Sequence, residues 1–294
     1  MISIRRILCP IDFSDTSRHA LTHAVAIAKW YESHVTVLHV IHFALMSHPP
    51  IPLAEFPKST ASTEKERQSM EAQLRAWVEP EHRAGVKIET LLEEGNPASR
   101  ILEQASSLQA DLIVMGTHGL SGFERFMLGS VAEKVLRKAS GPAMIVPPPA
   151  VTAAKVPYTQ LLCPVDFSES SLAAFRFACS MAQESDAHLT ILHVVDWPRD
   201  DEFDAPEFHR LAEEQARARL EGLVTNDLQI WSKPVTKVSY GKPYREILKV
   251  AESEETDLIV IGVSGRDALD RMLLGSTTNQ IVRCASCPVL ALRR

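Results

Sequence analysis

The chain has 294 residues, of which 45% are hydrophobic and 23% are charged, with 31 basic and 37 acidic side chains and a net charge of −6. This length and composition indicate a globular protein of two modest domains, and they exclude a collagen-like, a disordered or a membrane-spanning chain. The negative balance argues against a nucleic-acid partner held by bulk positive charge.

Short apolar runs alternate with segments of helical spacing through the first half of the chain. The apolar runs predict strands, and the helical spacing predicts that the segments between them are helices. Near-continuous apolar strands are typical of a parallel sheet covered on both faces. We therefore predict an α/β fold in which each domain is doubly wound, with a five-stranded parallel sheet and about four helices. The expected strands are 6–11, 34–40, 86–92, 112–116 and 143–147, and the expected helices are 14–32, 63–82, 97–108 and 130–139.

The second half repeats the motifs of the first in the same order and with the same spacing. Residues 7–15 read ILCPIDFSD and return at 161–169 as LLCPVDFSE, while 95–102 read GNPASRIL and return at 241–248 as GKPYREIL. Duplication of one unit accounts for this agreement. The boundary falls in a proline-rich linker. The predicted domains are 1–150 and 151–294.

The N-terminal segment and the cysteines both predict a cytoplasmic protein. Asp12 interrupts the first apolar run well before it reaches the length of a secretory or membrane segment. The five cysteines are odd in number and lack framework spacing, which favours reduced thiols. We therefore expect no membrane partner.

Matching glycine-rich loops follow the fourth strand of each half, where ligands of open α/β sheets bind. Residues 116–130 and 262–276 both read Gly-x2-Gly-x9-Gly-Ser. Glycines let backbone amides approach a ligand, and a Gly-Ser at a helix start offers N–H groups and a hydroxyl to a phosphate. A plainer interpretation stays open, in which the glycines permit tight turns and the serines cap helices. Neither half has a Walker loop or a Rossmann glycine pattern.

Together with PIDFSD, VLHV, DLIVMGTHG and the late Cys-Pro-Val-Leu segment, these loops resemble the universal stress protein family over nearly the whole chain. The resemblance implies tandem domains that bind ATP with Mg²⁺ or Mn²⁺. It also implies that the halves pair through their last strands as a pseudo-dimer within one chain, with a homodimer possible. Around adenine and ribose it implies Asp12, Val40 and Met115, and around the phosphates Gly116, Gly119, Gly129, Ser130 and Val131. The second-half positions are Asp166, Val194, Ile261, Gly262, Gly265, Gly275, Ser276 and Thr277.

Residues outside these loops predict no metal or redox site. Strand alternation puts His39 and His42 on opposite faces, which disfavours zinc. Cys284 and Cys287 have no second cysteine pair, which disfavours redox chemistry. Met115 and Ile261 also suit a plain place in the sheet core.

The function that we predict is an ATP-binding universal stress protein, a nucleotide-dependent stress or signalling factor. Two alternatives stay open. One is a slow ATPase or phosphotransferase, for which Asp12 and His118 are the candidate groups. The other is a pseudo-dimer that binds no nucleotide and works through protein contacts.

The two glycine loops differ in charge, and this difference predicts unequal sites. Asp267 aligns with Ser121, and Ala268 aligns with Gly122. A carboxylate near a phosphate repels it, so we expect the first site to bind ATP more tightly than the second.

Overall fold

The computed structural model describes residues 2–42, 64–82, 85–117, 128–148, 156–196, 206–224, 234–264 and 274–293. In the first half the strands are β1 (Arg6–Ile11), β2 (His34–Ile41), β3 (Lys87–Glu94), β4 (Leu112–Gly116) and β5 (Ala143–Val146). The helices between them are α1 (Asp15–Tyr31), α2 (Glu64–His82), α3 (Pro97–Ser107) and α4 (Ser130–Lys138).

The second half repeats this order of elements. Its strands are β6 (Gln160–Pro164), β7 (His188–Val195), β8 (Val235–Tyr240), β9 (Leu258–Gly262) and β10 (Val289–Leu292). Its helices are α5 (Glu169–Ser185), α6 (Pro206–Glu221), α8 (Pro243–Ser253) and α9 (Ser276–Cys284). None of the helices within the described ranges combines the length and the apolar character needed to cross a bilayer.

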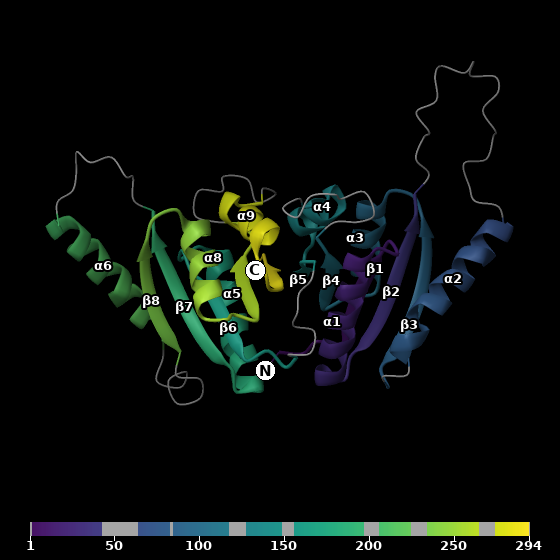
Figure 1. Cartoon of the computed structure of the whole chain (residues 1–294), viewed down its shortest axis with the longest axis horizontal. Coiled ribbons are helices and arrows are strands. Elements are labelled where there is room, and N and C mark those ends of the chain that lie inside the picture. The colour runs from purple at the N-terminus through teal and green to yellow at the C-terminus, as the bar shows by residue number, and fades with distance from the viewer. Residues whose placement is uncertain are drawn as a thin grey trace, which may run out of the picture.

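All ten strands belong to one sheet with the order β3-β2-β1-β4-β5-β10-β9-β6-β7-β8. The strands pair in parallel within each half, which confirms the predicted α/β fold. The halves meet where β5 and β10 pair antiparallel, with Met144 opposite Leu290. In Figure 1 this junction lies in the centre, and the edge strands β3 and β8 lie on the two outer sides.

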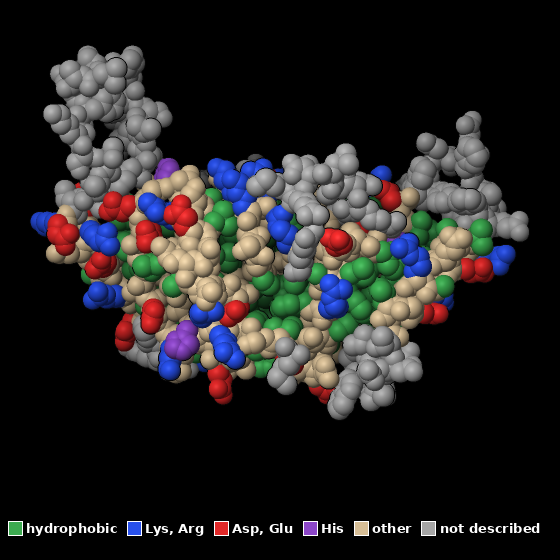
Figure 2. Space-filling model, turned by 180° about the vertical axis from the view of Figure 1, so that it is seen from behind, with side chains coloured by type: hydrophobic (Ala, Val, Ile, Leu, Met, Phe, Trp, Pro, Cys, Tyr) green, Lys and Arg blue, Asp and Glu red, His purple; other side chains and the backbone are tan. Residues whose placement is uncertain are grey.

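Successive residues of each strand pack into two different apolar layers. Ile7 and Cys9 of β1 belong to the layer that includes residues of α1, α2, α5 and α6, whereas Leu8 belongs to the layer that includes residues of α3, α4, α8 and α9. This alternation follows from the pleat of a strand whose two faces are both covered. Seen from behind in Figure 2, apolar side chains gather toward the middle of the molecule, and acidic and basic side chains are interspersed around them.

Helix α1 begins where it does because Ser14 caps it. The Ser14 side chain accepts a hydrogen bond from the Ser17 backbone N–H, and Glu32 ends the helix in the left-handed conformation at φ 54°. The second half uses Ser168 and Asp186 in the same places. The Ser14 and Ser168 caps fix the chain between β1 and α1, and between β6 and α5, at the carboxyl edge of the sheet.

Candidate functional site

A cavity of about 660 Å³ opens at the carboxyl ends of β1, β2 and β4, beside α3 and α4. A volume of this size suits a nucleotide-sized ligand. Its lining brings together seven of the eight first-half residues predicted for the site, and Gly119 lies outside the described residues. The seven are Asp12, Val40, Met115, Gly116, Gly129, Ser130 and Val131.

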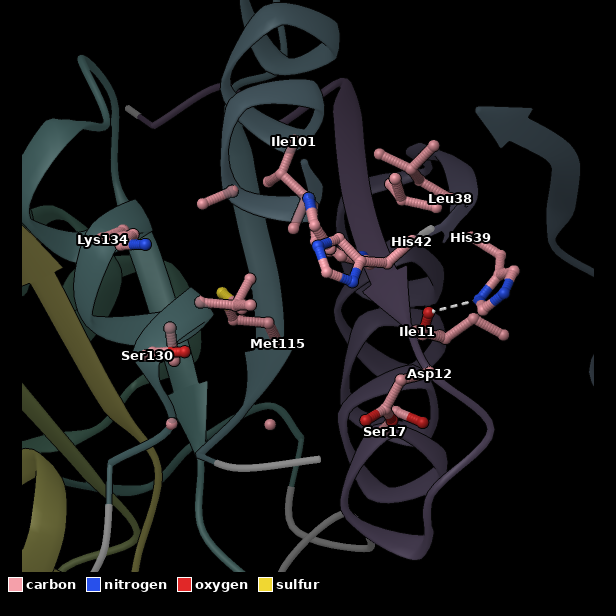
Figure 3. A pocket seen from close by; sticks show the side chains of 18 of the residues that line it. Ile11, Asp12, Ser17, Leu38, His39, His42, Ile101, Met115, Ser130 and Lys134 are labelled. Atoms are coloured by element: carbon pink, nitrogen blue, oxygen red, sulfur yellow. Dashed lines mark hydrogen bonds between the residues drawn. The ribbon is translucent and has the colours of Figure 1, made fainter. Parts of the chain in front are cut away.

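The inner wall of the cavity is apolar. Leu38 from β2, Ile101 from α3 and Met115 from β4 are almost fully buried, and Figure 3 shows their side chains around the same space. Met115 belongs to the sheet core as well as to the cavity wall. A wall of this kind can pack against a flat heterocyclic base.

Asp12 lies at the end of β1, where its carboxylate is held in one orientation. Its Oδ1 accepts hydrogen bonds from the backbone N–H of Ser14, at 3.1 Å, and from the Ser14 hydroxyl, at 2.5 Å. Phe13 between them takes the left-handed conformation, with φ 64°. A carboxylate fixed in this way at the cavity can accept hydrogen bonds from the hydroxyls of a sugar.

His39 ties the end of β2 to the end of β1. Its Nδ1 lies 2.9 Å from the carbonyl oxygen of Ile11, and because a carbonyl only accepts, Nδ1 donates (Figure 3). The ring also packs on Phe13, with 4.5 Å between centroids. His193 makes the equivalent bond to Val165, at 2.7 Å. Within the described ranges, no three His, Cys, Asp or Glu side chains come together as a metal site would require.

The opposite side of the cavity is formed by the start of α4. Gly129 caps this helix without a side-chain hydrogen bond, and its own N–H donates to the carbonyl of Thr117, at 2.7 Å, which joins the two ends of the glycine-rich loop. Ser130 and Val131 line the cavity in the first turn of this helix, where backbone N–H groups have no partner within the helix and an anion is attracted.

Lys134 is a cavity residue that the sequence interpretation missed. It lies one turn after Ser130 on α4, and both side chains stand on the side of the cavity opposite Asp12 (Figure 3). The spacing of four residues on a predicted helix was the signal that could have found it. His42, Asn96 and Ala98 also line the cavity without having been predicted.

A side chain at Gly116 or Gly262 would point toward a helix and not into the cavity. A Cβ on Gly116 would lie 3.1 Å from the backbone of Thr16 in α1, and a Cβ on Gly262 would lie 2.7 Å from the Ser171 nitrogen in α5. The strand end and the helix start approach closely at both positions, and the approach is closer at Gly262. The backbone of Gly116 still lines the cavity.

The second half keeps the framework of the site. Asp166 Oδ1 accepts from the Ser168 N–H at 3.0 Å and from the Ser168 hydroxyl at 2.6 Å. Gly275 caps α9 and donates to the Val263 carbonyl at 2.8 Å, so Ser276 and Thr277 begin that helix. Val194 is half-buried and Ile261 is buried in the sheet. The predicted residues Gly265, His118, Ser121, Gly122, Asp267 and Ala268 lie outside the described residues.

The thiols are placed for packing. All five cysteines are free, and every one except Cys284 is buried. Burial raises the pKa of the Cys287 thiol to about 12, so this group stays protonated near neutral pH. The surroundings of Cys287 therefore do not favour a reactive thiolate at this residue.

Comparison with known proteins gives one consistent result. A universal stress protein from Methanocaldococcus jannaschii is 39% identical over 145 residues, which are 49% of this chain and 83% of that protein. The crystal structure of a universal stress protein from Archaeoglobus fulgidus superposes with a TM-score of 0.67 at 22% identity and covers 100% of both chains. A protein of unknown function from Pseudomonas aeruginosa superposes with a TM-score of 0.65 at 18% identity and covers 99% of this chain and 92% of its own. At these identities the two structures show the same fold.

The family model described as the universal stress protein family matches the chain twice, over residues 3–147 and 157–293. The two matches correspond to the two repeated halves and include every strand of the sheet. The chain therefore belongs to the universal stress protein family and carries two tandem domains of that family.

Proposed function

We propose that the cavity of the first half binds ATP and that the chain acts as a nucleotide-dependent stress or signalling factor. One observation carries the proposal: a single cavity combines an apolar wall, a fixed carboxylate and an uncapped helix start beside a lysine. These are the chemistries that a base, a sugar and a phosphate chain require.

The residues fit the ligand as follows. Val40 and Met115 would pack against adenine, and Asp12 would accept from the ribose hydroxyls. The amides of Ser130 and Val131 would hold phosphate oxygens, with Lys134 balancing part of their charge. Mg²⁺ or Mn²⁺ would enter with the triphosphate, because Asp12 is the only carboxylate among the described residues that line the cavity.

Binding without rapid turnover is the activity that this arrangement favours. A phosphoryl-transfer site positions a nucleophile with a base and supports metal ions with carboxylates. Here the Asp12 carboxylate is already engaged by Ser14, and the described lining offers no second carboxylate. The chain would then work as a sensor of ATP whose bound state is read by another factor.

Two measurements test the proposal. Mass spectrometry of the full chain purified without added nucleotide is expected to show bound adenine nucleotide, and calorimetric titration with ATP and Mg²⁺ is expected to give saturable binding that GTP does not match. Absence of binding in both would contradict the proposal. A phosphate-release assay on the same sample separates binding from hydrolysis, and turnover on the scale of a kinase would favour the enzymatic alternative instead.

We predict that Lys134→Gln weakens ATP binding about fivefold, because a single exposed charge near a phosphate contributes about 1 kcal/mol. The loss should shrink as salt concentration rises. Lys138→Gln removes the same charge one turn further along α4, at a residue outside the cavity lining, and is the matched control. Titrations at low and high salt would check the prediction, and equal affinities for the two variants would contradict it.

A further inference from the structure

We infer that the second half carries a closed counterpart of the cavity, so that the chain binds one nucleotide and holds it in the first half. This inference rests on the proposed function and extends it to the stoichiometry of binding. It depends on positions at which the aligned motifs of the two halves differ. These positions lie at the start of α8, at the end of β7 and on α9.

The largest difference is one of volume. Helix α3 begins with Pro97 and Ala98, and Ala98 lies in the cavity wall. In the aligned segment, α8 begins with Pro243 and Tyr244. Tyr244 is half-buried and packs against the apolar cluster to which Ile261 belongs. A tyrosine ring therefore lies where the first half has a methyl group and open space.

The orientation of Tyr244 is held by its neighbour. Arg245 Nε donates to the Tyr244 hydroxyl oxygen at 3.0 Å, and its guanidinium carbon lies 5.7 Å from the ring centroid. The hydroxyl thus has a partner near the surface while the ring covers the apolar cluster, as amphipathic aromatic side chains commonly do. Opening the second site would require this ring to leave the surface that it covers.

An ion pair spans the same region in the second half. Lys242 Nζ lies 3.6 Å from Asp196 Oδ1, and the pair joins the start of α8 to the end of β7. The aligned first-half residues, Asn96 and His42, both line the open cavity. Both charged side chains are more than half exposed, so the pair adds little stability. Its consequence is that a paired ammonium and carboxylate occupy the region where the first half presents an amide and an imidazole to the cavity.

Helix α9 also lacks the cation of α4. The segment LGSVAEKV at 128–135 aligns with LGSTTNQI at 274–281, which puts Gln280 in the place of Lys134. Thr278 replaces Ala132, and its hydroxyl donates to the Gly262 carbonyl at 2.7 Å. Volume and charge thus both act against a nucleoside triphosphate in the second half, while the Asp166 and Gly275 framework remains.

The second half instead supports the helix that forms the first site. The guanidinium of Arg293, just after β10, donates to the carbonyl oxygens of Arg137 and Leu136 at the end of α4. A cation at a helix C-terminus stabilises the helix. Pro147 aligns with Arg293 in the first half and cannot return this contact to α9. Arg293 thus supports the helix beside the open first cavity, whereas Pro147 gives no such support to α9 in the second half.

Exchanging the aligned residues tests the inference in the full chain. Titration of ATP with Mg²⁺ is expected to give one nucleotide per wild-type chain and none for Ala98→Tyr, which copies the second half. Tyr244→Ala alone should leave the first-site affinity unchanged. The triple variant Tyr244→Ala, Lys242→Asn, Asp196→His copies the first half and is expected to gain a second, weaker site. Misfolding cannot explain a gain of binding.

Each outcome has a distinct meaning. No binding by the wild type would overturn the proposed function itself. Two nucleotides per wild-type chain, or undiminished binding by a folded Ala98→Tyr variant, would overturn the inference while leaving the proposed function intact. A triple variant that still binds one nucleotide would overturn the assignment of closure to these side chains. Circular dichroism melting of each variant gives the folding control.

Discussion

Replacing Gly262 with alanine is expected to lower the free energy of unfolding by about 3 kcal/mol, whereas the same change at Gly116 is expected to cost about 1 kcal/mol. A Cβ on Gly262 would lie 2.6 Å from Ser170 Oγ and 2.7 Å from the Ser171 nitrogen, so α5 must move away from β9. On Gly116 the nearest atoms belong to Thr16 at 3.1 Å, which a small shift of α1 relieves.

Denaturant unfolding of both variants measures this difference, and Gly141→Ala is the matched control. A Cβ on Gly141 would meet only the Ala110 carbonyl oxygen, at an ordinary 3.8 Å, so that variant should keep nearly wild-type stability. If Gly262→Ala proved as stable as Gly141→Ala, the close approach of β9 and α5 would be refuted. Substitutions at these glycines therefore report on packing, and phosphate binding is better tested at Lys134.

The chain is expected to lose about 3 kcal/mol of stability as the pH falls from about 6.5 to about 4. His23 on α1 is completely buried, its Nδ1 lies 3.1 Å from the Tyr158 hydroxyl oxygen, and its Nε2 has no hydrogen-bond partner among the described residues. Burial, with a smaller contribution from nearby His19, lowers the pKa of His23 from 6.5 to about 4. The unfolded chain therefore binds a proton over this pH range while the native chain does not, and stability falls with falling pH.

Unfolding free energies measured between pH 7 and pH 4 would check this. His23→Phe should flatten the pH dependence, because Phe177 occupies the aligned position of α5 and shows that the helix accepts a phenylalanine there. His34 on β2 is exposed, and His34→Gln should keep the wild-type pH dependence. If His23→Phe retained the full slope below pH 6.5, the loss would arise from other groups.

The sequence predicted the elements well where local signals agreed. Ser14 before α1 and Pro97 at the start of α3 both stand where a helix commonly begins, and the structure starts the helices there. The apolar run at 112–116 became β4 without a change of bounds. Joining of all ten strands into one sheet did not follow from local signals, because the pairing of Met144 with Leu290 depends on elements far apart in the chain.

Part of the candidate site was predictable from the sequence. Asp12 and Val40 stand at strand ends, where ligands of open α/β sheets gather, and the family resemblance implied them together with Met115; all three line the cavity. Ala98 was missed because a single sequence does not show which face of its helix turns to a ligand, whereas Lys134 could have been found from its spacing of four residues after Ser130. The part played by Tyr244 required the two halves to be compared side chain by side chain. The contribution of Asp267 to unequal affinity stays a prediction.

The central claim is that the first-half cavity holds ATP, and a crystal structure of the full chain grown with ATP and Mg²⁺ tests it most directly. We expect adenine between Val40 and Met115, ribose at Asp12, and phosphate oxygens at the amides of Ser130 and Val131, with the Lys134 ammonium beside them. Nucleotide bound in the second half while the first cavity stays without it would contradict the account, and so would nucleotide held only on the outer surface.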